Sequence, residues 1–142
     1  MKFGVLVATV ASAATVVAAP AAAARIEVGA RLQHQNVTRL APAGRQGDAE
    51  SSHWIVRDRY GKAIGDMLID CRWVTTDLRL CVGQMSLPLG AIAVLGASRT
   101  RFLGQLAVVG GTGRYVGAEG TLLFSATDKG RYVLSVDYET EE

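Results

Sequence analysis

Apolar and polar residues alternate with a period of two along several short stretches of the chain. The first runs from Arg25 to His34, where every second residue from Ile26 to Leu32 is apolar and the residues between are Glu, Gly and Arg. Alternation of this kind is typical of a β-strand with one face buried. No stretch after residue 25 keeps a helical period. The pattern therefore predicts an all-β protein.

Further segments have strand character and are bounded by turn residues. They are Ser51–Asp58, Lys62–Val74, Leu78–Met85, Ala91–Leu95, Arg99–Val109, Thr121–Ala126 and Arg131–Tyr138. The stretch from Val37 to Asp48 is predicted to be a loop, and Asp128–Gly130 a tight hairpin turn. Seven or eight short strands with regular turns predict a sandwich or a barrel, and the pattern alone does not separate the two.

A glycine-rich segment, Gly110–Gly120, lies between two of these strands. It lacks the Gly-Lys-Ser/Thr ending of a phosphate-binding P-loop. A dinucleotide fingerprint requires a helix after the glycines, and Thr121–Phe124 reads as a strand instead. We therefore expect these glycines to allow a compact chain reversal, because glycine adopts positive φ without a Cβ penalty.

The same segment resembles the signature of the allene oxide cyclase and dirigent barrel superfamily. The resemblance rests on Gly-Gly-Thr-Gly-Arg-Tyr followed by Gly-Ala-Glu-Gly and a strand. Other pieces follow in the expected order from Gly47 to Tyr138, and Glu119 is a departure, since the family more often has a basic or neutral residue there. The resemblance implies an eight-stranded antiparallel β-barrel and a homo-oligomer, a dimer or trimer. It does not determine the reaction, because fold alone does not imply function.

The first 24 residues are predicted to be a secretory signal peptide. Lys2 gives a basic start, Phe3–Val17 is apolar, and Ala21–Ala24 offers small residues for cleavage close to Arg25. The alternative, a membrane anchor, fits less well because the apolar run is short. Residues 25–142 then form one domain of 118 residues. We expect a secreted or extracytoplasmic protein that does not stay attached to the membrane after cleavage.

The formal net charge of +2 falls to +1 once Lys2 is removed. A chain so close to neutral gives no electrostatic reason to expect nucleic acid as a partner. The sequence also has no nucleophile elbow, no His-Glu-x-x-His zinc motif and no cofactor fingerprint. We therefore predict neither a cofactor nor a metal site.

Two cysteines in an exported chain suggest one disulfide. If residues 75–77 form a hairpin loop, counting outward from it places Cys71 directly opposite Cys81 on the same face. The sequence leaves open two other states, a pair of buried free thiols and a reactive thiol.

A small barrel can enclose one small ligand. The resemblance implies enzymes that cyclise or steer reactive intermediates without redox cofactors, and such chemistry requires an apolar cavity with an acid or base inside it. The candidates for the acid or base are Glu27, His53 and Asp66. The candidates for substrate-binding walls and contacts are Arg31, Trp54, Trp73 and Tyr115.

Each candidate also has an ordinary structural explanation. Glu27 and His53 fit a solvated strand face, and Asp66 fits a cap or a partner for a nearby arginine. Trp54, Trp73 and Tyr115 fit a packed core. Alternation shows which residues share a face but not which face is inside. If trimer formation buries the outer apolar faces, the polar face bearing Glu27, Arg31 and His53 points into the cavity instead.

The sequence thus predicts an exported barrel that acts on a hydrophobic small molecule. The leading hypothesis is a cofactor-independent cyclase or isomerase, or a dirigent-like steering protein, with a polyketide-like biosynthetic intermediate as the substrate. The competing hypothesis is a non-catalytic small-molecule-binding or structural barrel protein. An ionisable side chain inside an apolar cavity would favour the enzyme.

Overall fold

The computed structural model describes residues 23–40, 46–100, 103–128 and 130–140. They form eight strands and one short 3-10 helix, η1. The strands are β1 (Ala24–Thr38), β2 (Ala49–Arg57), β3 (Ala63–Trp73), β4 (Arg79–Leu87), β5 (Gly90–Ser98), β6 (Leu103–Gly111), β7 (Glu119–Asp128) and β8 (Arg131–Glu139), and η1 is Gly113–Tyr115. The predicted signal peptide lies almost wholly outside the described residues and stays a prediction.

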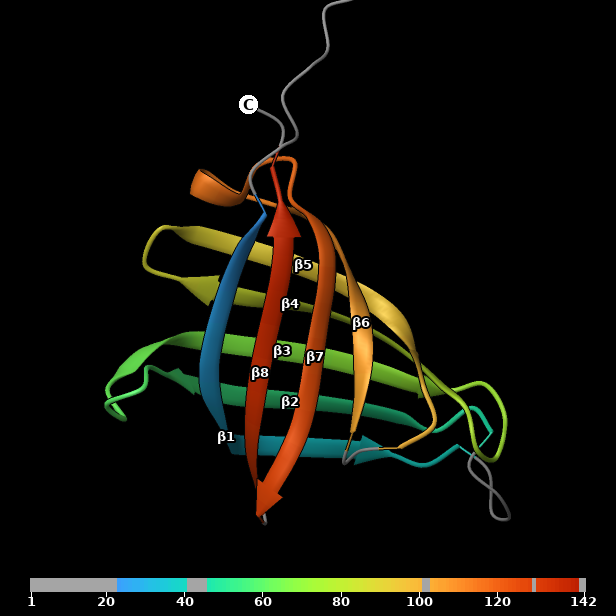
Figure 1. The fold of residues 1–142 in the computed structure, drawn as a ribbon. Helices are drawn as coiled ribbons and strands as arrows, with labels where there is room; N and C mark the ends of the chain where they lie inside the picture. Colours follow the sequence, from blue (N-terminus) through green and yellow to red (C-terminus); the bar gives the residue numbers. More distant parts are fainter. Residues whose placement is uncertain (1–22, 41–45, 101–102, 129, 141–142) are drawn as a thin grey trace, which may run out of the picture.

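The strands close into a barrel in which each strand pairs antiparallel with the next and β8 pairs with β1. Figure 1 shows β1, β8, β7 and β6 upright in front, with β2 to β5 crossing behind them. Strand β1 belongs to both groups: residues 24–31 pair with β8, and residues 29–38 pair with β2. The predicted eight-stranded antiparallel barrel is confirmed. Closure leaves no unpaired sheet edge, which protects a strand-rich chain from aggregation.

Strand β1 is longer than the sequence predicted. The segment from His34 to Thr38 was assigned to a strand end and a loop, but it pairs with residues 49–53 of β2. A register shift between Leu32 and His34 interrupts the alternation at this point. A bulge adds one residue to one strand, so the polar stretch that follows no longer fits a simple period of two.

The apolar face of the strands points into the barrel. Fully buried side chains include Val56, Met85, Ile92, Leu122 and Val136, each from a different strand. On β1, Val28 and Ala30 are buried while Arg25, Glu27 and Arg31 are exposed. Alternation left open which face of the strands lies inside, and in the single chain described it is the apolar face. The predicted homo-oligomer stays a prediction.

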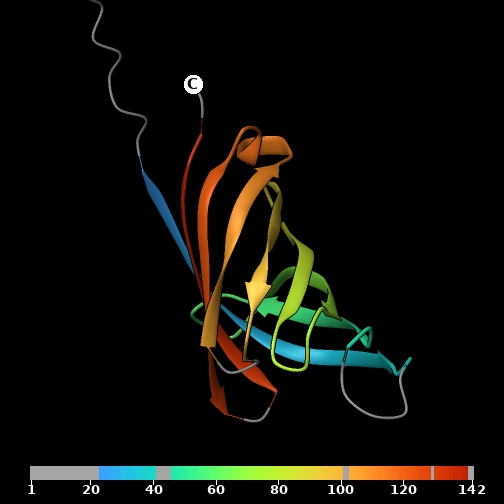
Figure 2. The same cartoon turned by 90° about the vertical axis from the view of Figure 1, so that its right-hand side faces the viewer.

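The barrel has two different ends. The end that we call the closed end is formed by the turn Asp58–Lys62, the turn Leu87–Gly90 and the glycine-rich segment with η1. The opposite end, which we call the open end, is formed by the turn Val74–Leu78 and the hairpin between β7 and β8. Figure 2 shows η1 at the closed end, above the ends of β6 and β7.

The glycine-rich segment packs closely against the turn that precedes β5. The amide of Thr112 donates to the carbonyl oxygen of Ala91 at 2.8 Å, and the amide of Arg114 donates to that of Leu89 at 2.9 Å. Gly113 has φ of 59°, and a Cβ there would clash with the backbone of Leu89 and Gly90. The segment thus fits its predicted structural role in a tight crossing.

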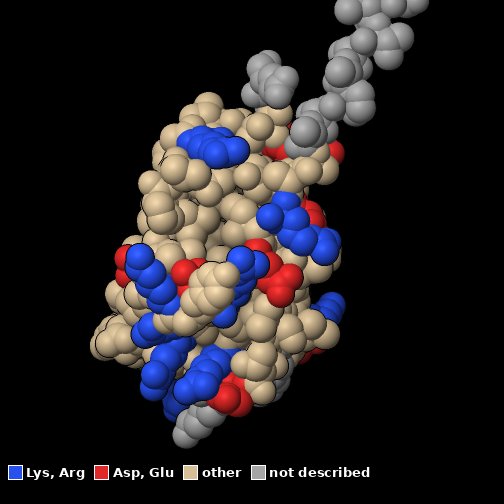
Figure 3. All heavy atoms as spheres, turned by 60° about the vertical axis from the view of Figure 1, so that its left-hand side comes forward, with Lys and Arg blue, Asp and Glu red and all other residues tan. Residues whose placement is uncertain are grey.

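Charged side chains cover the barrel unevenly. Figure 3 shows basic and acidic residues interspersed on the lower part of one side, and above them a mostly uncharged area with charged groups near its top and right-hand edge. None of the helical residues described forms a span long and apolar enough to cross a bilayer.

Candidate active site

A cavity of about 620 Å³ occupies the open half of the barrel. Its lining comes from the inward faces of β1 to β4 and β6 to β8 and from the β7–β8 hairpin. The lining residues are Ala30, Leu32, Gln35, Glu50, Ser52, Trp54, Met67, Ile69, Cys71, Arg79, Cys81, Leu106, Leu122, Phe124, Ala126, Thr127, Asp128, Gly130, Tyr132 and Leu134. Volume and predominantly apolar lining are typical of a pocket for one small organic molecule.

Three aromatic side chains form one wall of the cavity. Trp54 meets Tyr132 edge to face with ring centroids 4.9 Å apart, and Phe124 lies 6.3 Å from Tyr132 on its other side. The indole N–H of Trp54 donates to the hydroxyl of Ser52 at 2.9 Å, and that hydroxyl lies 3.4 Å from the carbonyl oxygen of Ile69. Edge-to-face packing and this hydrogen bond keep the wall rigid.

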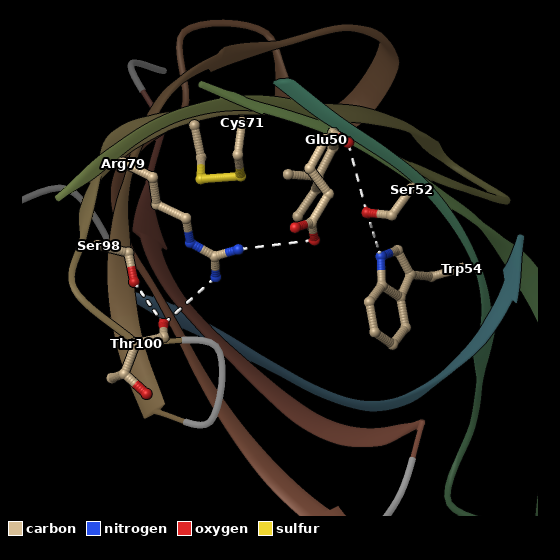
Figure 4. Close-up of a disulfide and its surroundings, with 9 residues drawn as sticks. Glu50, Ser52, Trp54, Cys71, Arg79, Ser98 and Thr100 are labelled. Carbon is tan, nitrogen blue, oxygen red and sulfur yellow. Dashed lines mark hydrogen bonds and ion pairs between the residues drawn. A yellow bond between two sulfur atoms is a disulfide. The ribbon is translucent and has the colours of Figure 1, made fainter. Parts of the chain in front are cut away.

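Two opposite charges face each other within this apolar surround. Glu50 on β2 and Arg79 on β4 form an ion pair, with Nη1 of Arg79 3.7 Å from Oε1 of Glu50, and both side chains are 8% exposed. Figure 4 shows them pointing toward one another between the disulfide and Trp54. Buried ion pairs are costly because desolvation offsets much of the attraction. A charge pair in such a place is therefore weak evidence for stability and a reason to consider function.

The guanidinium group of Arg79 is held from two further directions. Its Nη2 donates to the carbonyl oxygen of Thr100 at 3.3 Å, and the hydroxyl of Ser98 donates to the same oxygen at 2.7 Å. The ring of Trp73 lies 5.9 Å from its Cζ, within the range of a cation–π contact. These contacts fix the position of the cation at one side of the cavity.

A disulfide between Cys71 and Cys81 forms part of the same wall, as the hairpin count predicted. The two cysteines are register partners on β3 and β4 and are 6% and 3% exposed. The open alternatives of free or reactive thiols are thereby excluded in this structure. The bond links the strands that carry Ile69 and Arg79.

The predicted wall residues divide between the cavity and the core. Trp54 lines the cavity. Trp73 is buried beside Arg79 and does not line the cavity. Tyr115 is buried at the closed end, where its ring meets Tyr138 edge to face at 5.6 Å, and burial raises the pKa of its phenol.

The polar residues predicted for the site all lie on the outer face of the barrel. Glu27 and Arg31 are exposed on β1. His53 and Asp66 meet each other there, with Nε2 of the histidine 2.7 Å from Oδ1 of the aspartate. The structure brings this pair together but places none of the four in the cavity. Among the described residues, no group of three or more His, Cys, Asp and Glu side chains is placed to hold a metal ion.

Sequence reasoning missed Glu50 and Arg79, although a signal for both was present. The alternation that places Trp54 and Val56 inside also places residues 50 and 52 inside. Likewise, the face that carries Cys81 also carries Arg79. Glu50 is the second residue of its strand and Arg79 is the first, and charged residues at such positions are easily assigned to the preceding turn.

No family model matches the chain, and no curated protein matches it. Solved structures do. A pyocyanin demethylase superimposes with a TM-score of 0.75 at 18% identity, covering 81% of this chain and 99% of its own. A nonspecific heme-binding cyclase that catalyses a [4 + 2] cycloaddition in neoabyssomicin biosynthesis has a TM-score of 0.70 at 18% identity, with 84% of this chain and 65% of its own covered.

A pterocarpan synthase dirigent protein has a TM-score of 0.65 at 14% identity, covering 93% of this chain and 98% of its own. Identities this low show the shared fold and leave the activity open. Together with the closed eight-stranded topology, they show that this chain has the all-β barrel fold of these dirigent and cyclase structures, the fold that the sequence resemblance implied.

Proposed function

We propose that the protein is a cofactor-independent cyclase or isomerase, or a dirigent-like steering protein, that acts on a hydrophobic small molecule inside the open-end cavity. The observation that carries this proposal is the buried Glu50–Arg79 pair in an otherwise largely apolar pocket. A barrel with only a binding or structural role has no need of two desolvated charges that face each other.

The apolar part of the cavity supplies conformational control. The rings of Trp54, Phe124 and Tyr132 offer a rigid surface against which a flexible chain folds. Holding reacting atoms close together in the right orientation lowers a barrier by at most about 7–11 kcal/mol. Excluding water also protects a reactive intermediate from hydrolysis.

The polar pair supplies the electrostatic part. Arg79, held by the Thr100 carbonyl and the Trp73 ring, is positioned to stabilise negative charge that develops on a substrate oxygen. The carboxyl group of Glu50 is positioned to take a proton from one substrate atom and return it to another. Such a sequence conserves the substrate's formula, as isomerisation and cyclisation both require, and consumes no oxidant or reductant.

Apart from the pyocyanin demethylase, the names of the structural neighbours favour this class of reaction. Two of them are described as Diels–Alderases and one as a cyclase of [4 + 2] type, and two others as dirigent proteins. We propose for this chain a substrate of similar character, a polyketide-like intermediate with an unsaturated apolar chain and one polarisable carbonyl oxygen. The carbonyl oxygen would face Arg79 and the apolar chain the aromatic wall.

The test combines turnover with a matched pair of variants. Wild-type protein is expected to accelerate cyclisation or isomerisation of at least one member of a panel of linear unsaturated ketones, followed by chromatography. Glu50→Gln should lose this acceleration. Glu27→Gln, the same chemical change at the exposed position on β1, should retain it.

A second variant separates chemistry from folding. Glu50→Gln/Arg79→Met removes both charges together, so it leaves no unbalanced buried ion and should stay folded while inactive. Wild-type turnover in this double variant would remove the pair from the mechanism. Loss of turnover in Glu27→Gln instead would restore the site predicted from the sequence. Acceleration of no panel member by wild-type protein that nevertheless binds them would favour the non-catalytic binding protein.

We also propose that the protein is exported and cleaved near Arg25. The Cys71–Cys81 disulfide supports an oxidising location. Mass spectrometry of the secreted protein should find an N-terminus close to Arg25, and a cytoplasmic protein that retains Met1 would contradict export.

A further inference from the structure

Three arginines gather on the outer face of the barrel, around a glycine on β1. Gly29 is the register partner of Arg57 on β2, and Arg31, two residues further, is the register partner of Arg131 on β8. Residues 29 and 31 both point outward, because Val28 and Ala30 between and beside them are buried. The three side chains therefore project from three adjacent strands on the same face.

The surface between these arginines is concave. A groove of about 390 Å³ is lined by Gly29, Ala30, Arg31, Arg57, Thr127, Arg131, Tyr132 and Val133. At Gly29 an added Cβ would meet only two backbone oxygens, each 3.9 Å away, which is an ordinary van der Waals contact, so nothing crowds this position. Gly29 has no side chain to fill the groove that the three arginines line.

The positive charge of this groove is only partly balanced. Within the described part of the chain, the structure gives Arg131 an ion pair with Asp128 at 3.9 Å and gives Arg31 and Arg57 none. Arg57 donates instead to the carbonyl oxygen of Gly61 at 2.8 Å. Like charges directly across an antiparallel pair destabilise it, and Arg31 faces Arg131 in this way. An anion held between them would relieve this repulsion.

We propose that this arginine groove, made by Arg31, Arg57 and Arg131 around Gly29, binds a small oxyanion, the phosphate, sulfate or carboxylate group of a low-molecular-weight ligand. The planar fork of a guanidinium matches two oxygens of such a group, and three forks from adjacent strands surround one anion. The groove lies on the outer side of the wall formed by β1 and β8. Ala30, Thr127 and Tyr132 line both the groove and the cavity.

This site is separate from the Glu50–Arg79 pair and does not depend on the proposed reaction. The pair points into the barrel from β2 and β4, whereas the groove faces outward. Variants of one site can therefore be tested without altering the other.

The experiment titrates inorganic phosphate into the folded protein at constant ionic strength, with chloride as the balancing anion, and follows backbone amide shifts by NMR. The expected result is saturable binding, with the largest shifts at Gly29, Arg31 and Arg131. Arg31→Gln and Arg131→Gln should each weaken binding by about tenfold or more, as expected for loss of a hydrogen bond to a charged group. Arg72→Gln removes the same charge from an exposed position on β3, outside the groove, and should leave binding unchanged.

Gly29→Leu provides a steric test that changes no charge. The backbone at Gly29 does not have positive φ, and a Cβ there makes only ordinary contacts, so the fold should tolerate the leucine while its side chain fills the groove. Phosphate binding should then be lost. Equal weakening by Arg72→Gln and Arg31→Gln would overturn the proposal in favour of diffuse charge. Binding to vesicles of anionic phospholipid without binding of free phosphate would also overturn it, because the surface would then recognise a membrane.

Discussion

The two ends of the barrel are built on opposite principles. At the closed end, Ala118, Met85 and Ile92 have no exposed surface, and the backbone of the glycine-rich segment packs directly against its neighbours. At the open end, strands β1 to β4 and β6 to β8 line a cavity of about 620 Å³ whose wall includes an ion pair and a disulfide. The closed end is tightly packed, whereas the open end contains a pocket.

This difference separates glycines that serve the fold from residues that serve chemistry. The most recognisable motif of the sequence, Gly110–Gly120, lies at the end of β7 opposite the hairpin that lines the cavity. None of its residues lines the cavity. The pair that gives the pocket its polarity comes instead from two strand starts that carry no motif. In this barrel the glycine-rich segment belongs to the scaffold, and the inward-facing positions of the strands line the cavity.

The largest effect on stability should come from removing one charge of the open-end pair. Arg79→Met leaves the Glu50 carboxylate in a largely apolar surround and should lower the free energy of unfolding by about 3–5 kcal/mol. Glu50→Gln/Arg79→Met should recover most of this loss, because no unbalanced charge remains. Denaturant unfolding of the three proteins measures it. A double variant as unstable as Arg79→Met would mean that the pair contributes packing or hydrogen bonds rather than charge balance.

The next effect concerns the covalent link at the same end. Cys71→Ala/Cys81→Ala opens a loop with a sequence separation of 10 and should lower the free energy of unfolding by about 2–3 kcal/mol. Thermal melting under oxidising and reducing conditions provides the measurement. If reduction of wild-type protein, verified by thiol titration, left the melting temperature unchanged, the disulfide would have no part in holding the open end.

At the closed end, Gly111→Ala should destabilise the protein by about 1–3 kcal/mol through overpacking. Gly111 does not have positive φ, so the reason is steric: a Cβ there would lie 2.5 Å from the carbonyl oxygens of Ala91 and Tyr115. Gly29→Ala is the matched control, since its Cβ meets nothing closer than 3.9 Å. The melting curves of the two variants measure this difference in stability. Equal stability of the two variants would contradict the tight packing of this end.

The smallest effect is the pH dependence contributed by one exposed ion pair at each end. At the closed end, the hydrogen bond from Arg25, at 2.6 Å, lowers the pKa of Asp137 below its ordinary value. At the open end, the hydroxyl of Thr75 and then Arg99 lower the pKa of Asp77.

Because both folded-state pKa values lie below the unfolded value of about 3.9, the stabilisation is complete above that pH and is lost as the pH falls through the folded-state values. Melting temperatures between pH 6 and 3 should therefore fall less steeply in Asp137→Asn and Asp77→Asn than in the wild type. The two effects should add, since the sites are at opposite ends. Unchanged slopes would show that solvent screens both pairs completely.

Much of the fold could be predicted from the sequence. Alternation located several of the strands, short apolar runs bounded by turn residues located the others, and the resemblance carried by the glycine-rich segment favoured a barrel over a sandwich. The hairpin count identified Cys71 and Cys81 as partners, which the register confirms. The continuation of β1 to Thr38 was missed, because the bulge after Leu32 breaks the period that the prediction relied on.

The site was less predictable for a physical reason. Alternation defines two faces, and only closure of the barrel decides which one becomes the interior. Glu27, Arg31, His53 and Asp66 attract attention as polar residues on amphipathic strands, but that is the usual arrangement of a solvated face. Glu50 and Arg79 share inward faces with apolar residues, and their proximity depends on pairing across β2, β3 and β4, which no local pattern encodes. Trp54 lines the cavity, and its predicted role in substrate binding stays a prediction.

The central claim is that the open-end cavity is the ligand site, and the two tryptophans of the chain allow one direct measurement. The indole N–H of Trp54 lies in the cavity wall, whereas Trp73 is buried behind Arg79 and does not line it. In a ¹H–¹⁵N NMR titration with the neutral probe N-phenyl-1-naphthylamine, the Trp54 indole signal should shift and saturate while the glycine-rich segment stays unperturbed. Saturable binding that shifts the amides of Gly110–Gly120 and leaves the Trp54 signal in place would contradict the account.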